Sequence, residues 1–296
     1  MCPGYTAPAP VAVAPGHIAT FYVQFPSGLS ANIIGITLQQ GPTNTSVPLQ
    51  SVRTISECPD GIAGSQPACP SLLAVTVQIP YEVVPYCPLC LRPISAIPPL
   101  LTINQSGQPP AVIELNPLAD EVHVLTTCDV ALGATSQPNY TGLPCAPLVT
   151  HIDGTLVSAS SPANFGETLT AWVFGLGQTN PAASTGQPAK MAPAAETFNL
   201  DFNYSVNALA TKPVQASPNR ILIHPLYAGL APGYVGLYQV NFTVPQGAQN
   251  GIAHCALPGS SAPGSNVPQS NLTVSIGGQF SFDGAGICVN TQIPVD

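Results

Sequence analysis

The clearest covalent chemistry in this 296-residue chain belongs to its nine cysteines. Eight of them lie near one another in pairs, and we expect four local disulfides: Cys58–Cys69, Cys87–Cys90, Cys128–Cys145 and Cys255–Cys288. Cys2 is left over as the odd cysteine. Spacing alone does not fix the connectivity, because eight cysteines allow about a hundred pairings. Since disulfides persist in oxidising compartments, the pattern predicts an extracellular or cell-surface protein.

The closest pair, Cys87 and Cys90, also has the CxxC spacing of half a zinc site or of a thioredoxin-like redox motif. No second CxxC and no HxxxH pair follows it. Pro85, Pro88 and Pro93 surround the motif and prevent the helix that a redox site requires. We therefore expect a structural disulfide here, with no bound metal.

Acid–base chemistry is sparse. The five histidines are far apart in sequence, at His17, His123, His151, His224 and His254. The densest acidic cluster combines Asp120, Glu121, His123 and Asp129, whose oxygens would suit calcium at a domain junction, but it lacks a DxDxDG-like loop. No GxSxG, GxGxxG, GxxxxGK or HExxH motif occurs, and no pair of carboxylates stands out for glycoside hydrolysis. We expect no catalytic site, no metal and no cofactor.

Six asparagines stand in N-x-S/T sequons and are candidates for glycosylation. They are Asn44, Asn104, Asn139, Asn203, Asn241 and Asn271. A chain rich in Asn, Ser and Thr also yields several sequons by chance. Asn241 and Asn271 fall in expected strands and could face inward, so the expected loop positions Asn44, Asn104 and Asn139 are favoured.

Charged residues make up only 6% of the chain, against about 25% in an average soluble domain. Five Lys plus Arg cannot neutralise a run of phosphates, so the composition excludes nucleic acid as a partner. No stretch of about 18 apolar residues runs without Pro or a polar break, so we expect no membrane-spanning segment. The start, MCPGYTAPAP, lacks the basic and apolar regions of a signal peptide, which predicts a removed signal or a fragment.

The elements that must position these residues are predicted to be strands, because Pro or Gly interrupts nearly every possible helix. Short β-branched or aromatic segments, bounded by Pro, Gly or Asn, recur instead. In the first half they are 17–25, 33–38, 72–79, 100–104, 111–115 and 121–125. In the second half they are 167–174, 197–206, 220–223, 236–244, 271–276 and 278–282. This spacing predicts an all-β fold of two tandem immunoglobulin-like β-sandwich domains, stabilised by disulfides.

The two sets of strands repeat in order, which indicates an internal duplication. The matching segments are HIATFYVQF (17–25) with ETLTAWVF (167–174), AVTVQIPYEV (74–83) with YQVNFTVPQG (238–247), and PPLLTINQSG (98–107) with QSNLTVSIGG (269–278). We expect an extended N-terminal segment (1–14), a first sandwich (15–125) with a Cys-rich insert (58–90), a disulfide-pinned connector (126–149) and a second sandwich (150–296).

Two longer segments carry a family resemblance. THIDGTLVSASSPANFGETLTAWVFGLGQT (150–179) and PLYAGLAPGYVGLYQVNFTVPQG (225–247) resemble the Solibacter-type tandem C-terminal domain of acidobacterial secreted proteins. APGHIATFYVQF (14–25) and LAVTVQIPYEV (73–83) show the earlier part of that pattern. The resemblance implies a bacterial, extracellular pair of immunoglobulin-like (IPT/TIG-like) sandwiches and supplies no catalytic residues. The insert 58–90 and the loop 248–270 depart from it.

The most specific part of that resemblance is rich in glycine and tyrosine. Gly229, Gly233 and Gly236 are interpreted as tight turns. The tyrosines of the run are Tyr227, Tyr234 and Tyr238. Packing in the core or at a corner of the sandwich is favoured for them over a carbohydrate-binding platform.

Low charge bears on function because soluble β-proteins usually protect exposed sheet edges with Lys, inward charges or bulges. This chain has two lysines, Lys190 and Lys212, both in expected loops. We therefore expect association between copies of the chain, with covalent glycans as a further partner. The favoured function is a non-enzymatic structural subunit of a cell-surface or extracellular filament; the alternative is a carbohydrate-binding or adhesive module of a larger secreted protein.

The N-terminal segment offers a means of association. Its alternating residues Tyr5, Ala7, Ala9, Val11 and Val13 would give a strand one apolar face. We predict that residues 5–14 add to the sheet of a neighbouring copy, with Cys2 as a covalent link. The alternative is that the segment folds back as an edge strand of its own domain or lies along it in polyproline form.

Overall fold

The computed structural model describes residues 10–24, 33–55, 72–85, 98–107, 109–129, 145–205, 221–246, 252, 254–255 and 270–290. Apart from one helical turn at 127–129, all of the regular structure in these residues is β-strand. The all-β prediction is therefore confirmed. The disulfides Cys128–Cys145 and Cys255–Cys288 are both formed, as predicted. The other expected pairs, Cys58–Cys69 and Cys87–Cys90, lie outside the described residues, as does Cys2.

The first half of the chain folds into two facing sheets, which we call the first sandwich. Its strands are β1 (Val11–Val13), β2 (Ile18–Gln24), β3 (Ile33–Gln40), β4 (Thr43–Ser46), β5 (Leu49–Ile55), β6 (Leu72–Gln78), β7 (Leu100–Gln105) and β8 (Ala111–Pro117). One sheet has the order β1-β8-β7-β3-β4 and the other the order β2-β6-β5. Alternate residues Leu73, Val75 and Val77 of β6 are fully buried between the sheets, so the period-two pattern of the sequence forms the core.

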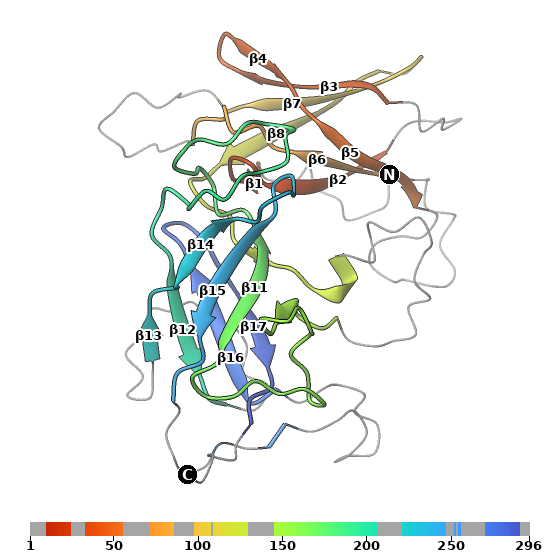
Figure 1. The fold of residues 1–296 in the computed structure, drawn as a ribbon. Helices are drawn as coiled ribbons and strands as arrows, with labels where there is room; N and C mark the ends of the chain where they lie inside the picture. Colours follow the sequence, from red (N-terminus) through yellow and green to blue (C-terminus); the bar gives the residue numbers. More distant parts are fainter. Residues whose placement is uncertain are drawn as a thin grey trace.

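The second half forms the second sandwich, which lies below the first in Figure 1. Its strands are β9 (His123–Val124), β10 (Val149–Thr150), β11 (Thr168–Phe174), β12 (Asn199–Asn203), β13 (Ile221–Ile223), β14 (Tyr227–Leu230), β15 (Tyr238–Thr243), β16 (Leu272–Gly277) and β17 (Phe282–Ile287). One sheet has the order β10-β11-β15-β14, with β9 also paired to β11, and the other the order β13-β12-β16-β17. Phe202 and Phe242 pack between the sheets with ring centroids 5.8 Å apart.

The two sandwiches share one connectivity. The order β2-β6-β5 corresponds to β11-β15-β14, and β3-β7-β8 corresponds to β12-β16-β17. Both orders agree with the B-E-D and C-F-G sheets of immunoglobulin sandwiches. Each of the three repeated segment pairs of the sequence falls on corresponding strands. The match extends to single bonds, because the amide of Gly16 donates to the Ile79 carbonyl oxygen (2.9 Å) as that of Gly166 does to Val244 (2.9 Å).

The boundary between the sandwiches lies earlier than residue 125. Val122 and Val124 belong to the core of the second sandwich, and β9 pairs antiparallel with β11. The chain therefore enters the second sandwich a few residues before the predicted boundary. The segment looked continuous with the first half because sequence spacing does not reveal which sheet a two-residue strand will join.

The described end of the N-terminal segment folds back on its own domain. β1 pairs in parallel with β8, and Val13 is fully buried in the first core. The intramolecular alternative therefore holds for Val11 and Val13, which cannot insert into a neighbour while they occupy this position. Tyr5, Ala7 and Ala9 lie outside the described residues.

Candidate functional site

A buried polar contact lies at the junction between the two sandwiches. Tyr81 follows β6, and Tyr238 begins β15. Their hydroxyl oxygens lie 3.2 Å apart, and that of Tyr238 is 2.5 Å from the carbonyl oxygen of Gly177. Burial raises the pKa of both tyrosines. The pair therefore remains protonated and acts as a buried polar contact between the halves.

A loop of the second sandwich crosses the end of β6. The amide of Gly186 donates to Oε1 of the fully buried Gln78 (2.6 Å). The Thr185 hydroxyl accepts from the Tyr81 amide (2.9 Å) and donates to the Glu82 carboxylate (2.7 Å). These bonds join residues more than a hundred positions apart, so they fix one sandwich against the other.

Two glycines of the FGLG run (174–177) pack directly against the segment that connects β8 to β9. A Cβ on Gly175 would lie 1.8 Å from the Glu121 carbonyl oxygen, and one on Gly177 would lie 2.0 Å from that of Ala119. Both have φ near +80°. Glycine is required at both positions of the FGLG run, because only glycine lets these two chain segments approach so closely.

Three glycines of the segment 225–247 are required either for turns or for close packing. Gly233 and Gly236 have positive φ, as the turn interpretation requires, and Gly236 also lies against Gly16. Gly229 does not have positive φ, so the turn interpretation is wrong for it; a Cβ there would be 2.4 Å from the Ala192 carbonyl oxygen. Close packing, rather than turn geometry, selects glycine at that position.

Asp120, the first residue of the acidic cluster considered for calcium, binds backbone amides. Its carboxylate is fully buried and accepts the amides of Gln279, Phe280 and Ser281 at 2.7–3.2 Å, together with the Ser281 hydroxyl. These donors occupy the oxygens that a cation would need. In the part of the chain that the structure describes, no three His, Cys, Asp or Glu side chains gather closely enough to hold a metal.

His123 lies between two carboxylates. Its Nε2 is 3.3 Å from Asp129, and its Nδ1 is 3.2 Å from Asp283 of β17. Hydrogen bonds to Asp129 and Asp283 raise the pKa of His123 to about 9. Although burial acts in the opposite direction, the hydrogen bonds lower the pKa of Asp129 to about 2. The cluster is an ion pair that holds β9 against β17. The Thr126 hydroxyl donates to the same Asp129 oxygen (2.7 Å), so it contacts the carboxylate and not the imidazole.

His17 has the opposite environment. Its ring lies 6.5 Å from that of Phe174 across the junction, and its buried Nδ1 has no hydrogen-bond partner among the described residues. Burial, followed by the charge of His123, lowers the pKa of His17 to about 4. The imidazole is therefore neutral at pH 7.

These two histidines are expected to affect the folding stability at opposite ends of the pH range. The His123 pKa is raised on folding, so its stabilisation is complete below about pH 6.5 and is lost toward pH 9. The His17 pKa is lowered, so stability falls from pH 6.5 toward pH 4 as the unfolded chain takes up the proton.

We expect His17→Phe to reduce this loss of stability in acid by about 1–3 kcal/mol, measured by urea unfolding at pH 4.5 and pH 7. His224→Phe, on an exposed side chain, is the control; equal pH profiles for both variants would refute the assignment.

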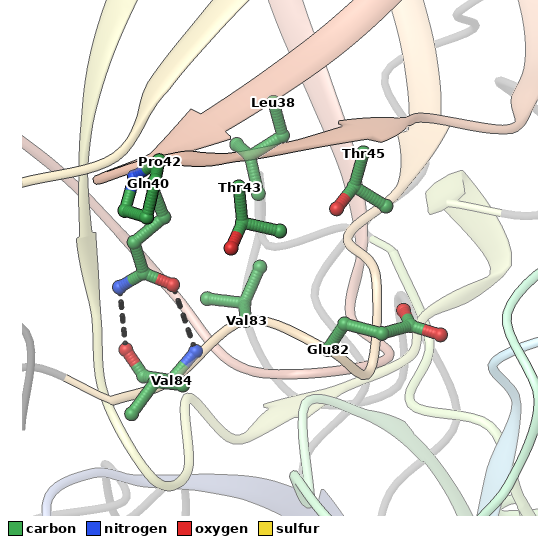
Figure 2. Close-up of a pocket in the computed structure, with 8 residues that line it drawn as sticks. All are labelled: Leu38, Gln40, Pro42, Thr43, Thr45, Glu82, Val83 and Val84. Carbon is green, nitrogen blue, oxygen red and sulfur yellow. Dashed lines mark hydrogen bonds between the residues drawn. The ribbon is translucent and has the colours of Figure 1, made fainter.

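A groove lies beside the β3–β4 hairpin of the first sandwich (Figure 2). It has a volume of about 310 Å³. Its lining is Leu38, Gln40, Pro42, Thr43, Thr45, Glu82, Val83 and Val84. The Gln40 amide is already bonded to both backbone groups of Val84 (2.9 and 3.0 Å). Since the lining contains no aromatic ring and one carboxylate, it offers neither a surface for stacking a sugar nor a catalytic pair.

The sequons differ sharply in access. Asn271 is 1% exposed and exchanges two hydrogen bonds with the Val289 backbone, at 2.8 and 2.9 Å. It is therefore wrong as a glycosylation candidate. The prediction that Asn104 and Asn44 lie in loops is wrong, because Asn104 lies in the central strand β7 and Asn44 lies in β4. Asn44 in β4 and Asn203 in β12 are exposed. Asn139 lies outside the described residues.

We expect Asn44 to carry glycan and Asn271 to carry none when the chain passes through a glycosylating secretory pathway. The physical reason is that a transferase must reach the side-chain amide, which is exposed in Asn44 and buried in Asn271. Glycopeptide mass spectrometry of the folded protein measures both positions. Occupancy at Asn271 equal to that at Asn44 would contradict the structure.

The three tyrosines of the segment 225–247 also differ in their exposure to solvent. Tyr238 is fully buried and the Tyr227 hydroxyl donates to the Leu230 carbonyl oxygen (3.1 Å), so the packing interpretation fits both. Tyr234 is 58% exposed. The three rings therefore do not form one platform.

Comparisons with known proteins supply no function. No protein-family model matches the chain, and none of the curated proteins matches it. Within the described ranges, no helix is long and apolar enough to cross a membrane. The resemblance to the Solibacter-type domain stays a prediction that rests on the quoted segments.

Proposed function

We propose that the chain is a non-enzymatic structural subunit of an extracellular or cell-surface assembly formed by copies of itself. The observation that carries the proposal is the absence of charge from most of its sheet edges. The edge strands β1, β2, β4, β13 and β14 contain no Lys, Arg, Asp or Glu, whereas the edge strands β5 and β17 contain Arg53 and Asp283. Such edges are templates for pairing with another chain unless something protects them.

β13 is the strongest candidate edge. Its sequence is Ile-Leu-Ile, and within the described residues it pairs only with β12. Leu222 at its centre is 52% exposed, and Leu226 three residues beyond the strand is 66% exposed. By contrast, the outer edge of β14 is bonded to residues 192–194. Among the described residues this edge is apolar, uncharged and open, which supports the pairing of strands between copies.

The junction supports a structural role in a second way. An assembly transmits its geometry only if each subunit is rigid, and the buried Tyr81–Tyr238 contact and the bonds of Gln78 and Thr185 resist hinge motion. The two disulfides support an extracellular location, because such bonds persist in oxidising compartments. Glycans on accessible sequons form part of the same proposal.

Sedimentation velocity of the purified chain at rising concentration tests the proposal. We expect species larger than the 30.3 kDa monomer. Their population should be almost unchanged between 0.1 and about 1 M NaCl, because contacts between uncharged edges are not screened by salt. A monomer at every concentration would refute self-association, and dissociation by salt would refute the uncharged edges as the contact.

A further inference from the structure

The chain contains one tryptophan, Trp172, and it lies outside the hydrophobic core. Its neighbours Ala171 and Val173 in β11 point inward and are fully buried, whereas the Trp172 side chain is partly exposed on the outer face of the sheet. A large aromatic ring is usually placed in the core of a sandwich, where its burial stabilises the fold most. Its position on the surface of a central strand suggests a ligand.

The register of the sheet surrounds this ring with hydroxyl and amide groups. Trp172 stands opposite Gln239 of β15, and Thr170 stands opposite Asn241. The indole Nε1 donates to the Thr150 hydroxyl (3.3 Å), which restricts the ring. The Thr170 hydroxyl donates to Asn241 Oδ1 (3.2 Å). The side-chain amide of Gln239 makes no hydrogen bond among the described residues.

The strands β10, β11, β15 and β14 bring no charge to the outer face of this sheet, and His123 of β9, opposite Phe174, is paired with Asp129 and Asp283. The partly exposed side chains of the four strands on this face are Thr150, Thr168, Thr170, Trp172, Tyr227, Gln239, Asn241 and Thr243. Four strands at the usual spacing make a surface about 14 Å across. The opposite sheet differs, because Thr273 and Ser275 on the outer side of β16 are only 2% and 4% exposed. Among the described residues of the second sandwich, the face that carries Trp172 is therefore the more open of the two.

We propose that this face, with Trp172 at its centre, binds a neutral polysaccharide. The apolar face of a sugar ring fits the flat indole, and the side-chain amides of Gln239 and Asn241 can donate to its hydroxyls, while the Thr170 oxygen can accept from one. The absence of charge matches an uncharged polymer and disfavours an acidic one. This activity is separate from self-association through β13, which lies in the other sheet of the sandwich.

The single tryptophan makes the test direct, because all indole fluorescence comes from the site. The full chain, made in a host without N-glycosylation so that Asn241 stays free, is titrated with a soluble β-glucan, an α-glucan and a mannan, and with alginate as the acidic control. We expect a saturable change in emission with at least one neutral polymer and none with alginate.

Affinity electrophoresis in gels that contain the same polymers tests the variants. Trp172→Ala should weaken retardation at least about tenfold, the effect of losing an aromatic anchor. Tyr234→Ala removes an exposed ring elsewhere and should be retarded as strongly as the native chain. No retardation by any neutral polymer, or equal retardation of Trp172→Ala and the native chain, overturns the proposal. A change in emission that follows protein concentration alone also overturns it, since a second copy would then cover the face.

Discussion

Alanine at Gly175 or Gly177 is expected to lower the free energy of unfolding by at least about 3 kcal/mol. The added Cβ would lie 1.8 Å from the carbonyl oxygen of Glu121 or 2.0 Å from that of Ala119, so β11 and the segment that connects β8 to β9 would have to move apart. The positive φ of both glycines adds strain of about 1 kcal/mol. Urea unfolding followed by Trp172 fluorescence measures the loss.

Gly233→Ala is the matched control for this prediction. Gly233 has a φ of 84°, close to those of Gly175 and Gly177, but no atom lies within 4 Å of the position of its Cβ. The control should therefore lose only about 1 kcal/mol, the cost of the backbone conformation. If all three variants lost the same free energy, close approach at the junction would not be what requires the two earlier glycines.

Leu222→Lys is expected to abolish assembly while leaving the monomer folded. The substitution places a charge at the centre of β13, which is the means by which natural sheets protect an open edge. Leu222 is 52% exposed, so its loss should cost the monomer less than about 1 kcal/mol. Sedimentation velocity measures the assembly, and circular dichroism measures the fold.

Ile152→Lys controls for the added charge alone. Ile152 is 90% exposed in the turn at residues 151–154 and belongs to no sheet edge. This variant should assemble as the native chain does. If Leu222→Lys assembled equally well, β13 would not be the contact, and another uncharged edge such as β4 would have to replace it.

Features of the fold that depend on local pattern could be predicted from the sequence. Alternation of apolar residues placed β6, β11 and β15 correctly, because a strand with one buried face must repeat with period two. The order of those segments revealed the duplication that the two equivalent topologies share. The local pairs Cys128–Cys145 and Cys255–Cys288 could be predicted because their partners are near in sequence.

Features that depend on contacts between distant segments could not be predicted in this way. His123 meets Asp283 across a separation of 160 residues, and nothing in its own neighbourhood indicates that partner. Asn271 has an intact sequon, yet its amide is bonded to Val289 inside the fold. The acidic cluster suggested calcium because its carboxylates are close in sequence, whereas Asp120 is directed at the amides of residues 279–281.

The outward position of Trp172 had a sequence signal that could have been used. Within TLTAWVF, the small and branched residues Leu169, Ala171 and Val173 share one face, so Trp172 must lie on the other. The chemistry of that face still required the register of β15, since Gln239 and Asn241 come from a strand some seventy residues away.

Electron microscopy of the native material tests the central claim most directly. Copies that pair through uncharged sheet edges should form polymers with a regular subunit repeat, each subunit containing two sandwiches with the first lying across one end of the second as in Figure 1. Leu222→Lys prepared in parallel should show single particles. Native material that consists only of dispersed monomers, under conditions in which the chain is folded and its disulfides are intact, would contradict the account.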